Sequence, residues 1–381
     1  MKDPIRQRLF TPGPINTGEA VRNAMQRDMG SRDAAFIQIV RDIRKELLKI
    51  AGAGSEFAAV PMQGSGTFAI EAAIGSLIPA DGRLLVLSNG AYGRRMIAIA
   101  RRLGIAVESI ETPETEPNDP ASVKAHLAMH PEVTHVAAVH CETTTGILNP
   151  IPEIGTVVAA AGRHFIVDAM STFGGIPVDV AGWNIGCLIA SANKCIEGVP
   201  GIAFAIVRTA SLEASLGHAR SVSLDLCDQW DELERSGQFR FTPPTHVLLA
   251  FAAALEALAR EGGAGAREKR YRENQRTLLL GMNAMGFATV LRADLQSPIL
   301  TAFHSPADAR FAFEDFYGRL AARGLVIYPG KLSRIDSFRI GTIGQLTPQD
   351  LADLLEGIRA SLVDMGIALP LALRAKAPPA R

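Results

Sequence analysis

Two apolar runs with a lysine between them decide the fold: residues 185–209 read "IGCLIASANKCIEGVPGIAFAIVRT". Each run is short and continuous, as in strands that are buried on both faces, and the segment "EGVPG" at 197–201 marks a turn between them. Lys194 follows the first run directly. Ligands in open α/β sheets bind at the carboxyl ends of strands, so Lys194 is a candidate site residue, although most lysines on turns are surface residues.

The same alternation extends outward toward the N-terminus. Apolar runs alternate with longer helical patterns, and residues 18–51 have the spacing of one or two amphipathic helices. The strand-like runs are "FAAVPM" (57–62), "RLLVLSN" (83–89), "THVAAVHCE" (134–142) and "HFIVDAM" (164–170), and the helical patterns cover 68–78, 93–104 and 152–164. This order predicts an α/β protein with a large three-layer domain around a mainly parallel sheet.

A different pattern begins after the glycines of "EGGAGARE" (261–268), which interrupt a long helical stretch. Strand candidates at 288–291, 299–304, 325–330 and 337–344 mix there with helical patterns at 307–323 and 347–364. We therefore expect a large domain over 1–260, with an extended N-terminal segment, and a smaller C-terminal α+β domain over 261–381. The final Ala- and Pro-rich stretch, 369–381, is expected to fray.

The composition of the chain argues against several classes of function. Lys plus Arg and Asp plus Glu both number 39, so the zero net charge gives no field that would attract nucleic acid or anionic lipid, and a small-molecule ligand fits better. The four cysteines form no CxxC pair, which suits a reducing compartment and argues against structural zinc. The N-terminus lacks the apolar core of a signal peptide, and the longest apolar stretch is broken by Glu256, so we expect no membrane span and a cytoplasmic location.

Two further motifs carry chemistry. In "MQGSGTFAIEAA" (62–73), Ser65, Gly66 and Thr67 join a strand to a helix, where free backbone N–H groups could hold a phosphate or where the turn could simply cap the helix. In "HFIVDAMSTFGG" (164–175), Asp168 ends an apolar strand and could be a cap, a metal ligand or the partner of a protonated heterocycle. No second carboxylate is placed for a hard-metal site, so we predict no metal. A phosphate cup, a strand-end aspartate and a strand-end lysine are together what pyridoxal 5'-phosphate requires.

The motifs also resemble a known family. They are "TPGP" (11–14), "QGSGTFAIEA" (63–72), "SNGAYGRR" (88–95), "HCETTTGILNPI" (140–151), "IVDAMSTFGGIP" (166–177), "SANKCIEGVPG" (191–201), "SLDL" (223–226), "RFTPPTH" (240–246), "YPGK" (328–331) and "FRIGTIG" (338–344). In this order they resemble the fold-type I aminotransferases of the alanine:glyoxylate branch, and among these the members that use 2-aminoethylphosphonate and pyruvate. The resemblance covers nearly the whole chain.

The resemblance implies roles for the cofactor site. Lys194 would form the Schiff base with pyridoxal 5'-phosphate and move the proton, and Asp168 would pair with the pyridinium nitrogen. The other implied cofactor contacts are Ser65, Gly66 and Thr67 at the phosphate, Asn193 beside them, Tyr92 stacked on the ring and Thr143 near the phenolic oxygen. A packing role for Tyr92 and a plain strand role for Thr143 remain the alternatives.

It also implies a homodimer with shared active sites, because Thr242 matches a residue that reaches the phosphate in the neighbouring subunit; alternatively, Thr242 caps a Pro-rich turn. Arg339 would bind the acidic group of the substrate, and Arg32, in "MGSRDAAF" (29–36), is either a second anion contact or a surface residue paired with Asp33. The implied reaction is amino transfer from 2-aminoethylphosphonate to pyruvate in phosphonate catabolism. The alternative is a neighbouring aminotransferase that uses alanine or serine with glyoxylate or pyruvate.

Overall fold

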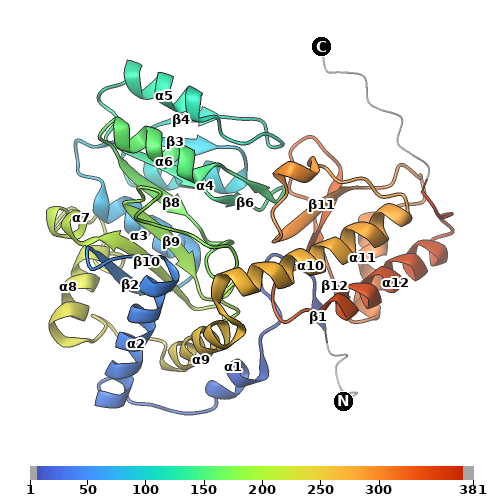
Figure 1. Ribbon diagram of the computed structural model, residues 1–381, viewed down its shortest axis with the longest axis horizontal. Coiled ribbons are helices and arrows are strands. Elements are labelled where there is room, and N and C mark those ends of the chain that lie inside the picture. Colours follow the sequence, from blue (N-terminus) through green and yellow to red (C-terminus); the bar gives the residue numbers. More distant parts are fainter. Residues whose placement is uncertain (1–6, 372–381) are drawn as a thin grey trace.

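A seven-stranded sheet organises the first two thirds of the chain in the computed structural model, which describes residues 7–371 (Figure 1). Its strands, in spatial order, are β2 (Phe57–Gln63), β10 (Ile202–Arg208), β9 (Cys187–Ser191), β8 (His164–Asp168), β5 (His135–Val139), β3 (Arg83–Ser88) and β4 (Ala106–Glu111). Within the described residues β10 is the one strand of this sheet that runs antiparallel to its neighbours. The predicted α/β class with a mainly parallel sheet is confirmed.

Helices pack on both faces of this sheet, because each presents an apolar stripe (Figure 1). In α2 (Ala34–Ile50), for example, Phe36, Val40, Ile43 and Leu47 are buried at spacings of three and four residues. The other helices of this part are α1 (Glu19–Ala24), α3 (Gly66–Leu77), α4 (Ala91–Arg102), α5 (Pro120–Met129), α6 (Ile151–Ala160), α7 (Thr209–Ala214), α8 (Leu226–Ser236) and α9 (Thr245–Glu261). Their buried faces and the strands form one continuous core.

The C-terminal part has a core of its own, built on a three-stranded antiparallel sheet. Its elements are α10 (Gly263–Ala284), β11 (Leu300–His304), α11 (Phe313–Ala322), β12 (Leu325–Val326), β13 (Tyr328–Pro329), β14 (Ser337–Gly341) and α12 (Pro348–Asp364), with a short 3-10 helix at Ala293–Leu295. The predicted strand at 288–291 is wrong, because this segment forms a single bridge, between Thr289 and Phe303. The predicted glycine interruption is present, since Gly262 takes φ 105° and ends α9.

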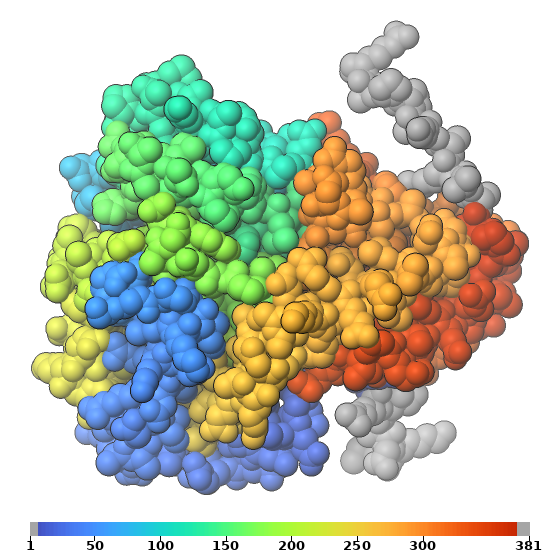
Figure 2. All heavy atoms as spheres, viewed as in Figure 1, coloured from blue at the N-terminus to red at the C-terminus, as the bar shows by residue number. Residues whose placement is uncertain are grey.

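The N-terminal strand belongs to this second core. Strand β1 (Arg8–Leu9) pairs in parallel with β12, and Phe10 is buried among the C-terminal residues. Figures 1 and 2 show α10 running from the large sheet to the C-terminal helices without a gap between the two parts. The division of the chain at residue 260 stays a prediction.

Two expectations concern the ends and the surroundings of the chain. Of the stretch expected to fray, 369–381, residues 372–381 lie outside the described residues, while the Leu371 N–H donates to Met285 O at 2.8 Å. Within residues 7–371, none of the helices combines the length and apolarity needed to cross a membrane.

Candidate active site

The predicted site residues follow the carboxyl ends of five strands of the large sheet. Ser65, Gly66 and Thr67 follow β2, Tyr92 follows β3, Asp168 ends β8, and Asn193 and Lys194 follow β9. Beyond β5, Thr143 lies in the turn of a short hairpin, between β6 (Cys141–Glu142) and β7 (Ile147–Leu148). These five strands run in one direction. β3, β5, β8 and β9 pair in parallel, one beside the next, and β2 and β9 are both antiparallel to the β10 strand between them. Their ends therefore meet at one edge of the sheet, where ligands of open α/β folds bind.

The Lys194 amine lies against the N-terminal segment. Its Nζ donates a hydrogen bond to Pro12 O at 2.8 Å. Gly13, at φ +132°, lies so close that a Cβ there would be 2.1 Å from Nζ, so the position requires glycine. Burial is the main cause that lowers the pKa of Lys194 to about 8. A fraction of this amine is therefore unprotonated near neutral pH.

Asp168 is a buried carboxylate, 2 % exposed, whose Oδ1 accepts a bond from the Met170 N–H at 2.8 Å. Its pKa is raised to about 6, mainly by burial and also by the neighbouring Glu142 charge, while the Met170 N–H, Arg95 and Lys194 favour the ionised form. A carboxylate held in so apolar a place is stabilised by any cation that comes beside it.

The start of α3 is suited to an anion. Ser65 is the N-cap, and within residues 7–371 its hydroxyl makes no capping hydrogen bond. Arg95 Nη1 donates to Thr67 Oγ1 at 3.1 Å, which adds a guanidinium to the free N–H groups of the first turn. A Cβ at Gly66 would lie 2.3 Å from the sulfur of Met170, so the approach of the backbone to the site is close. Arg95 lies in the motif "SNGAYGRR", but its contact with Thr67 was not predicted from sequence.

Tyr92 is positioned by a second buried acid. Glu142 Oε2 accepts from the Tyr92 N–H at 3.1 Å, and Glu142 Oε1 accepts from the Thr144 N–H and hydroxyl at 3.1 and 2.6 Å. Burial raises the pKa of Glu142. Two cations contact the Tyr92 ring, with Arg95 Cζ at 4.9 Å and Lys331 Nζ at 5.5 Å from its centroid. Neither Glu142 nor Lys331 was singled out from sequence.

Arg339 joins the C-terminal part to this edge. It lies in β14 between β11 and β13, paired with Ala302 and Tyr328, and is 2 % exposed. Its Nη1 donates to Thr143 O at 2.8 Å and its Nε to Pro329 O at 2.9 Å. Desolvation lowers the pKa of Arg339, and a guanidinium held by two neutral carbonyls still lacks an anionic partner among these contacts.

A buried ion cluster fixes the loop after Lys194. Glu197, at φ 66° and 2 % exposed, accepts from Arg270 Nη2 at 2.8 Å and from the Tyr271 hydroxyl at 2.6 Å. Arg267 Nη1 donates to Cys195 O and Ile196 O at 2.8 and 3.2 Å. Helix α10 thus holds the backbone that carries Lys194. Sequence analysis missed this cluster, because its members lie about 70 residues apart in the chain.

Thr242 and Arg32 lie close to each other, in a pocket apart from the residues around Lys194. Both line a pocket of about 370 Å³ with Ser31 and residues 238–243, and none of the residues described around Lys194 lines it. In a single chain these two predicted contacts are therefore separated from the other nine.

The comparisons with known proteins agree with this geometry. The family described as aminotransferase class-V matches residues 18–346. This chain belongs to the class-V aminotransferases. It is 51 % identical over 359 residues to 2-aminoethylphosphonate–pyruvate transaminase of Syntrophobacter fumaroxidans, covering 94 % of this chain and 97 % of that protein. The same-named enzyme of Salmonella typhimurium strain LT2 is 49 % identical over 356 residues, 93 % of this chain and 97 % of that one.

Solved aminotransferases share the fold. Pyridoxamine-pyruvate aminotransferase from Mesorhizobium loti has a TM-score of 0.87 at 27 % identity, covering 96 % of this chain and 94 % of that chain. Ureidoglycine-glyoxylate aminotransferase from Bacillus subtilis has a TM-score of 0.89 at 25 % identity, covering 97 % and 96 %. The predicted fold-type I architecture is confirmed.

A cysteine beside Lys194 and a cavity on the far side of the sheet have no part in the proposed active site. The thiol of Cys195, next to Lys194, is free and buried, and its pKa is raised by burial, so it is a poor nucleophile. A cavity of about 270 Å³ lies at the opposite edge of the sheet, where β5 and β8 begin with His135 and His164. Burial lowers the pKa of His135 to about 3, so this ring is neutral.

Proposed function

We propose that this aminotransferase transfers the amino group of 2-aminoethylphosphonate to pyruvate, giving phosphonoacetaldehyde and L-alanine, as a step of phosphonate catabolism. The observation that carries the proposal is the identity of about half of all residues, over nearly the full length, with proteins named for this reaction. The motifs at the sheet edge and Arg339 in β14 lie within the matched region. We also infer a cytoplasmic location, since the cysteines are free and no helix of the described part could span a membrane.

The residues at the sheet edge fit pyridoxal 5'-phosphate. The N-terminus of α3 with Ser65, Gly66, Thr67 and Arg95 suits a phosphate, and the buried Asp168 carboxylate suits a pyridinium. Tyr92, Thr143 and Asn193 follow strand ends beside them and would contact the ring or its substituents. When bound, pyridoxal phosphate supplies an electron sink for the electrons left when a substrate C–H bond breaks.

Lys194 would attach the cofactor and afterwards move the proton. Its pKa of about 8 means that the released amine is partly the free base at neutral pH and can accept a proton at Nζ from the substrate carbon. The hydrogen bond to Pro12 O holds Nζ in place, and burial around it keeps water from competing for that proton. Asp168, ionised beside a cation, would keep the ring nitrogen protonated.

Arg339 would select and orient the substrate. Its remaining N–H donors, in a site that is almost fully desolvated, suit a phosphonate or carboxylate oxygen. Arg95 and Lys331 both lie over the Tyr92 ring, and Tyr92 acts electrostatically on Arg339, so these three cations give this side of the site a surplus of positive charge. A phosphonate, which bears more charge than a carboxylate, gains more from that surplus.

We further propose a homodimer with shared active sites. Thr242 is exposed and shares its pocket with Arg32, so a partner surface that buried one would bury the other. If Thr242 reaches the cofactor phosphate of the partner, as its motif implies, Arg32 enters the same site as a second anion contact.

The test is a half-reaction followed by the absorption of the bound cofactor. We expect 2-aminoethylphosphonate to convert the holoenzyme to the amino form of the cofactor, and pyruvate to reverse the change. L-serine should leave the spectrum unchanged, and Lys194→Ala should show neither the original band nor turnover. As a matched control, Lys331→Ala removes a neighbouring amine and should keep the band.

The opposite substrate preference would assign the chain to the alanine/serine–glyoxylate type and reject the proposal. For the dimer, mixing Lys194→Ala chains with Thr242→Ala chains should restore activity, because a mixed dimer keeps one complete site. Loss of activity in every mixture would reject the shared site while leaving the reaction untouched.

A further inference from the structure

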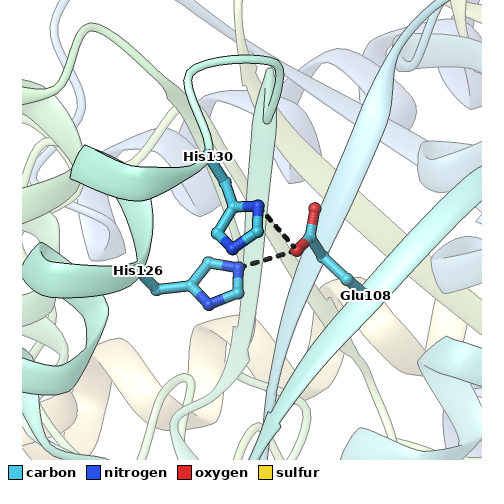
Figure 3. Close-up of side chains that lie close together, drawn as sticks. All are labelled: Glu108, His126 and His130. Carbon is cyan, nitrogen blue, oxygen red and sulfur yellow. Dashed lines mark hydrogen bonds and ion pairs between the residues drawn. The ribbon is translucent and has the colours of Figure 1, made fainter.

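Three potential metal-binding side chains converge at the edge of the large sheet, on elements that take no part in the proposed active site. Glu108 points out from β4, the edge strand, His126 is in the last turn of α5, and His130 is the residue at its C-cap (Figure 3). The two histidines are four residues apart, a spacing that places side chains on one face of a helix. Their rings stack with centroids 4.3 Å apart.

The donor atoms have the spacing of a metal site. His126 Nε2 lies 2.8 Å and His130 Nδ1 lies 3.8 Å from the same oxygen, Glu108 Oε2, and one ligand atom from each residue lies within 4.8 Å of the others. Zinc bonds to nitrogen and carboxylate oxygen are about 2.0–2.2 Å, so two ligands of a tetrahedral zinc are about 3.3–3.5 Å apart. The two observed distances bracket this value, and small rotations of the side chains would equalise them.

We propose that Glu108, His126 and His130 bind a divalent transition-metal ion of the zinc class. The set of two imidazoles and one carboxylate is a ligand combination that zinc takes in proteins, with a fourth position open to water. In the metal-free protein His126 Nε2–H can donate to Glu108 and His130 Nδ1–H can donate to Glu132; on binding, these two nitrogens would offer lone pairs to the ion, with the ring proton on the other nitrogen. The side chains of His126 and Glu108 are 19 % and 21 % exposed, so the ion can enter from solvent.

The alternative is a plain cluster of hydrogen bonds and ion pairs. Glu132 and Arg83 also lie there, with Glu132 Oε1 at 3.2 Å from His130 Nδ1 and Arg83 Nη1 at 3.9 Å from Glu108 Oε1. Glu108 Oε1, however, is buried and makes no hydrogen bond to any described residue. One arginine, Arg83, faces both carboxylates, Glu108 and Glu132, each at 3.9 Å, so a divalent ion would balance negative charge that Arg83 leaves.

A metal here would cross-link β4 to α5, which are joined through residues 112–119. Inside that connection Glu114 accepts from Arg94 Nη2 at 2.8 Å and from the Ser333 N–H at 3.0 Å, so it also touches the C-terminal part. Closing the two ends of the connection would stabilise an edge strand that has a partner on one side only in the described sheet. The prediction of no metal rested on the surroundings of Asp168 alone. Glu108 and His126 could not be associated from sequence, because they lie eighteen residues apart in two elements that were not predicted.

The test uses the purified holoenzyme, freed of metal by chelation and dialysis. Zinc is titrated in competition with a chromogenic chelator, and cobalt is added in parallel, because cobalt in a tetrahedral protein site gives intense visible bands. The variants are His126→Gln and Glu108→Gln. The matched control is His246→Gln, because His246 also pairs with a carboxylate, Asp28 at 3.0 Å, but in the described part of the chain it is in no three-donor group.

We expect the wild type and His246→Gln to bind one more zinc ion than either site variant, or to bind that ion at least about tenfold more tightly. Zinc should raise the thermal midpoint of these two proteins and not that of the site variants. Transaminase activity should be the same in all four. Equal zinc stoichiometry and affinity in the wild type and in either site variant would overturn the proposal, as would the absence of tetrahedral cobalt bands from the wild type.

Discussion

The substitution Gly13→Ala tests whether the contact of Gly13 with Lys194 positions the amine, separately from its effect on the stability of the fold. The new Cβ would lie 2.1 Å from Lys194 Nζ, whereas ordinary contacts begin at 3.4 Å, so the amine must move by about 1.3 Å to reach an ordinary contact. A misplacement of about 1 Å at a reacting group costs on the order of 100-fold in rate. The backbone at φ +132° adds strain of about 1–3 kcal/mol, while the clash itself costs little, because it falls on the end of a flexible side chain.

The assay measures kcat for amino transfer and the free energy of unfolding in urea. The control is Gly162→Ala, which places alanine at φ +68° with no described atom within 4 Å of its Cβ and thus adds strain without a clash. We expect both variants to lose about 1–3 kcal/mol of stability and Gly13→Ala alone to lose about 100-fold in kcat. If the two variants had equal kcat, the contact of Gly13 with Lys194 would not position the amine.

Two other predictions rest on burial. In the cofactor-free protein, the rate of acylation of Lys194 should be half-maximal near pH 8 rather than near pH 10.5. Because the pKa of Lys194 is lower in the folded than in the unfolded chain, its contribution to stability should rise with pH between these two values. The opposite slope would refute the desolvation argument. Glu197→Gln should lower the free energy of unfolding in urea by about 3 kcal/mol, because the fully buried Arg267 then keeps, among the described residues, only Glu261 at 2.7 Å as a full countercharge. The exposed pair of Asp308 is the control, and Asp308→Asn should lower it by less than about 1 kcal/mol. Equal losses would contradict the importance of burial.

The sheet could be predicted from sequence where strands are apolar throughout. The runs at β2, β3, β5, β8, β9 and β10 are continuous and buried, so their hydrophobicity marks them. Strand β4 was missed, because "AVESIE" alternates with charges and lies at the edge of the sheet, half-buried. Helix α5 was missed with it. Both missed elements carry the proposed metal ligands.

The site could be predicted where a residue directly follows a strand. Asp168 and Lys194 were predicted to share one edge of the sheet in this way, because parallel strands bring their carboxyl ends together regardless of the sequence between them. Pro12 and Glu197 could not be found, since the first acts through a backbone carbonyl and the second through partners on α10. Local patterns encode neither kind of contact.

Arg339 and the partner of Lys194, the Pro12 carbonyl, lie on two backbone segments that are in direct contact. The Gly341 N–H donates to Phe10 O at 2.9 Å, two residues from Arg339 on one strand and two residues from Pro12 on the other. Gly341 is also so close to Thr11 that a Cβ there would lie 2.3 Å from its carbonyl carbon, so the segments cannot shift separately. Because β1 pairs with β12, Pro12 moves with the C-terminal part although it comes first in the chain. If Arg339 binds the acidic group of the substrate, as we propose, a shift of Arg339 would be transmitted through this contact to the Pro12 carbonyl that accepts from Lys194 Nζ, and we expect substrate binding to loosen that hydrogen bond.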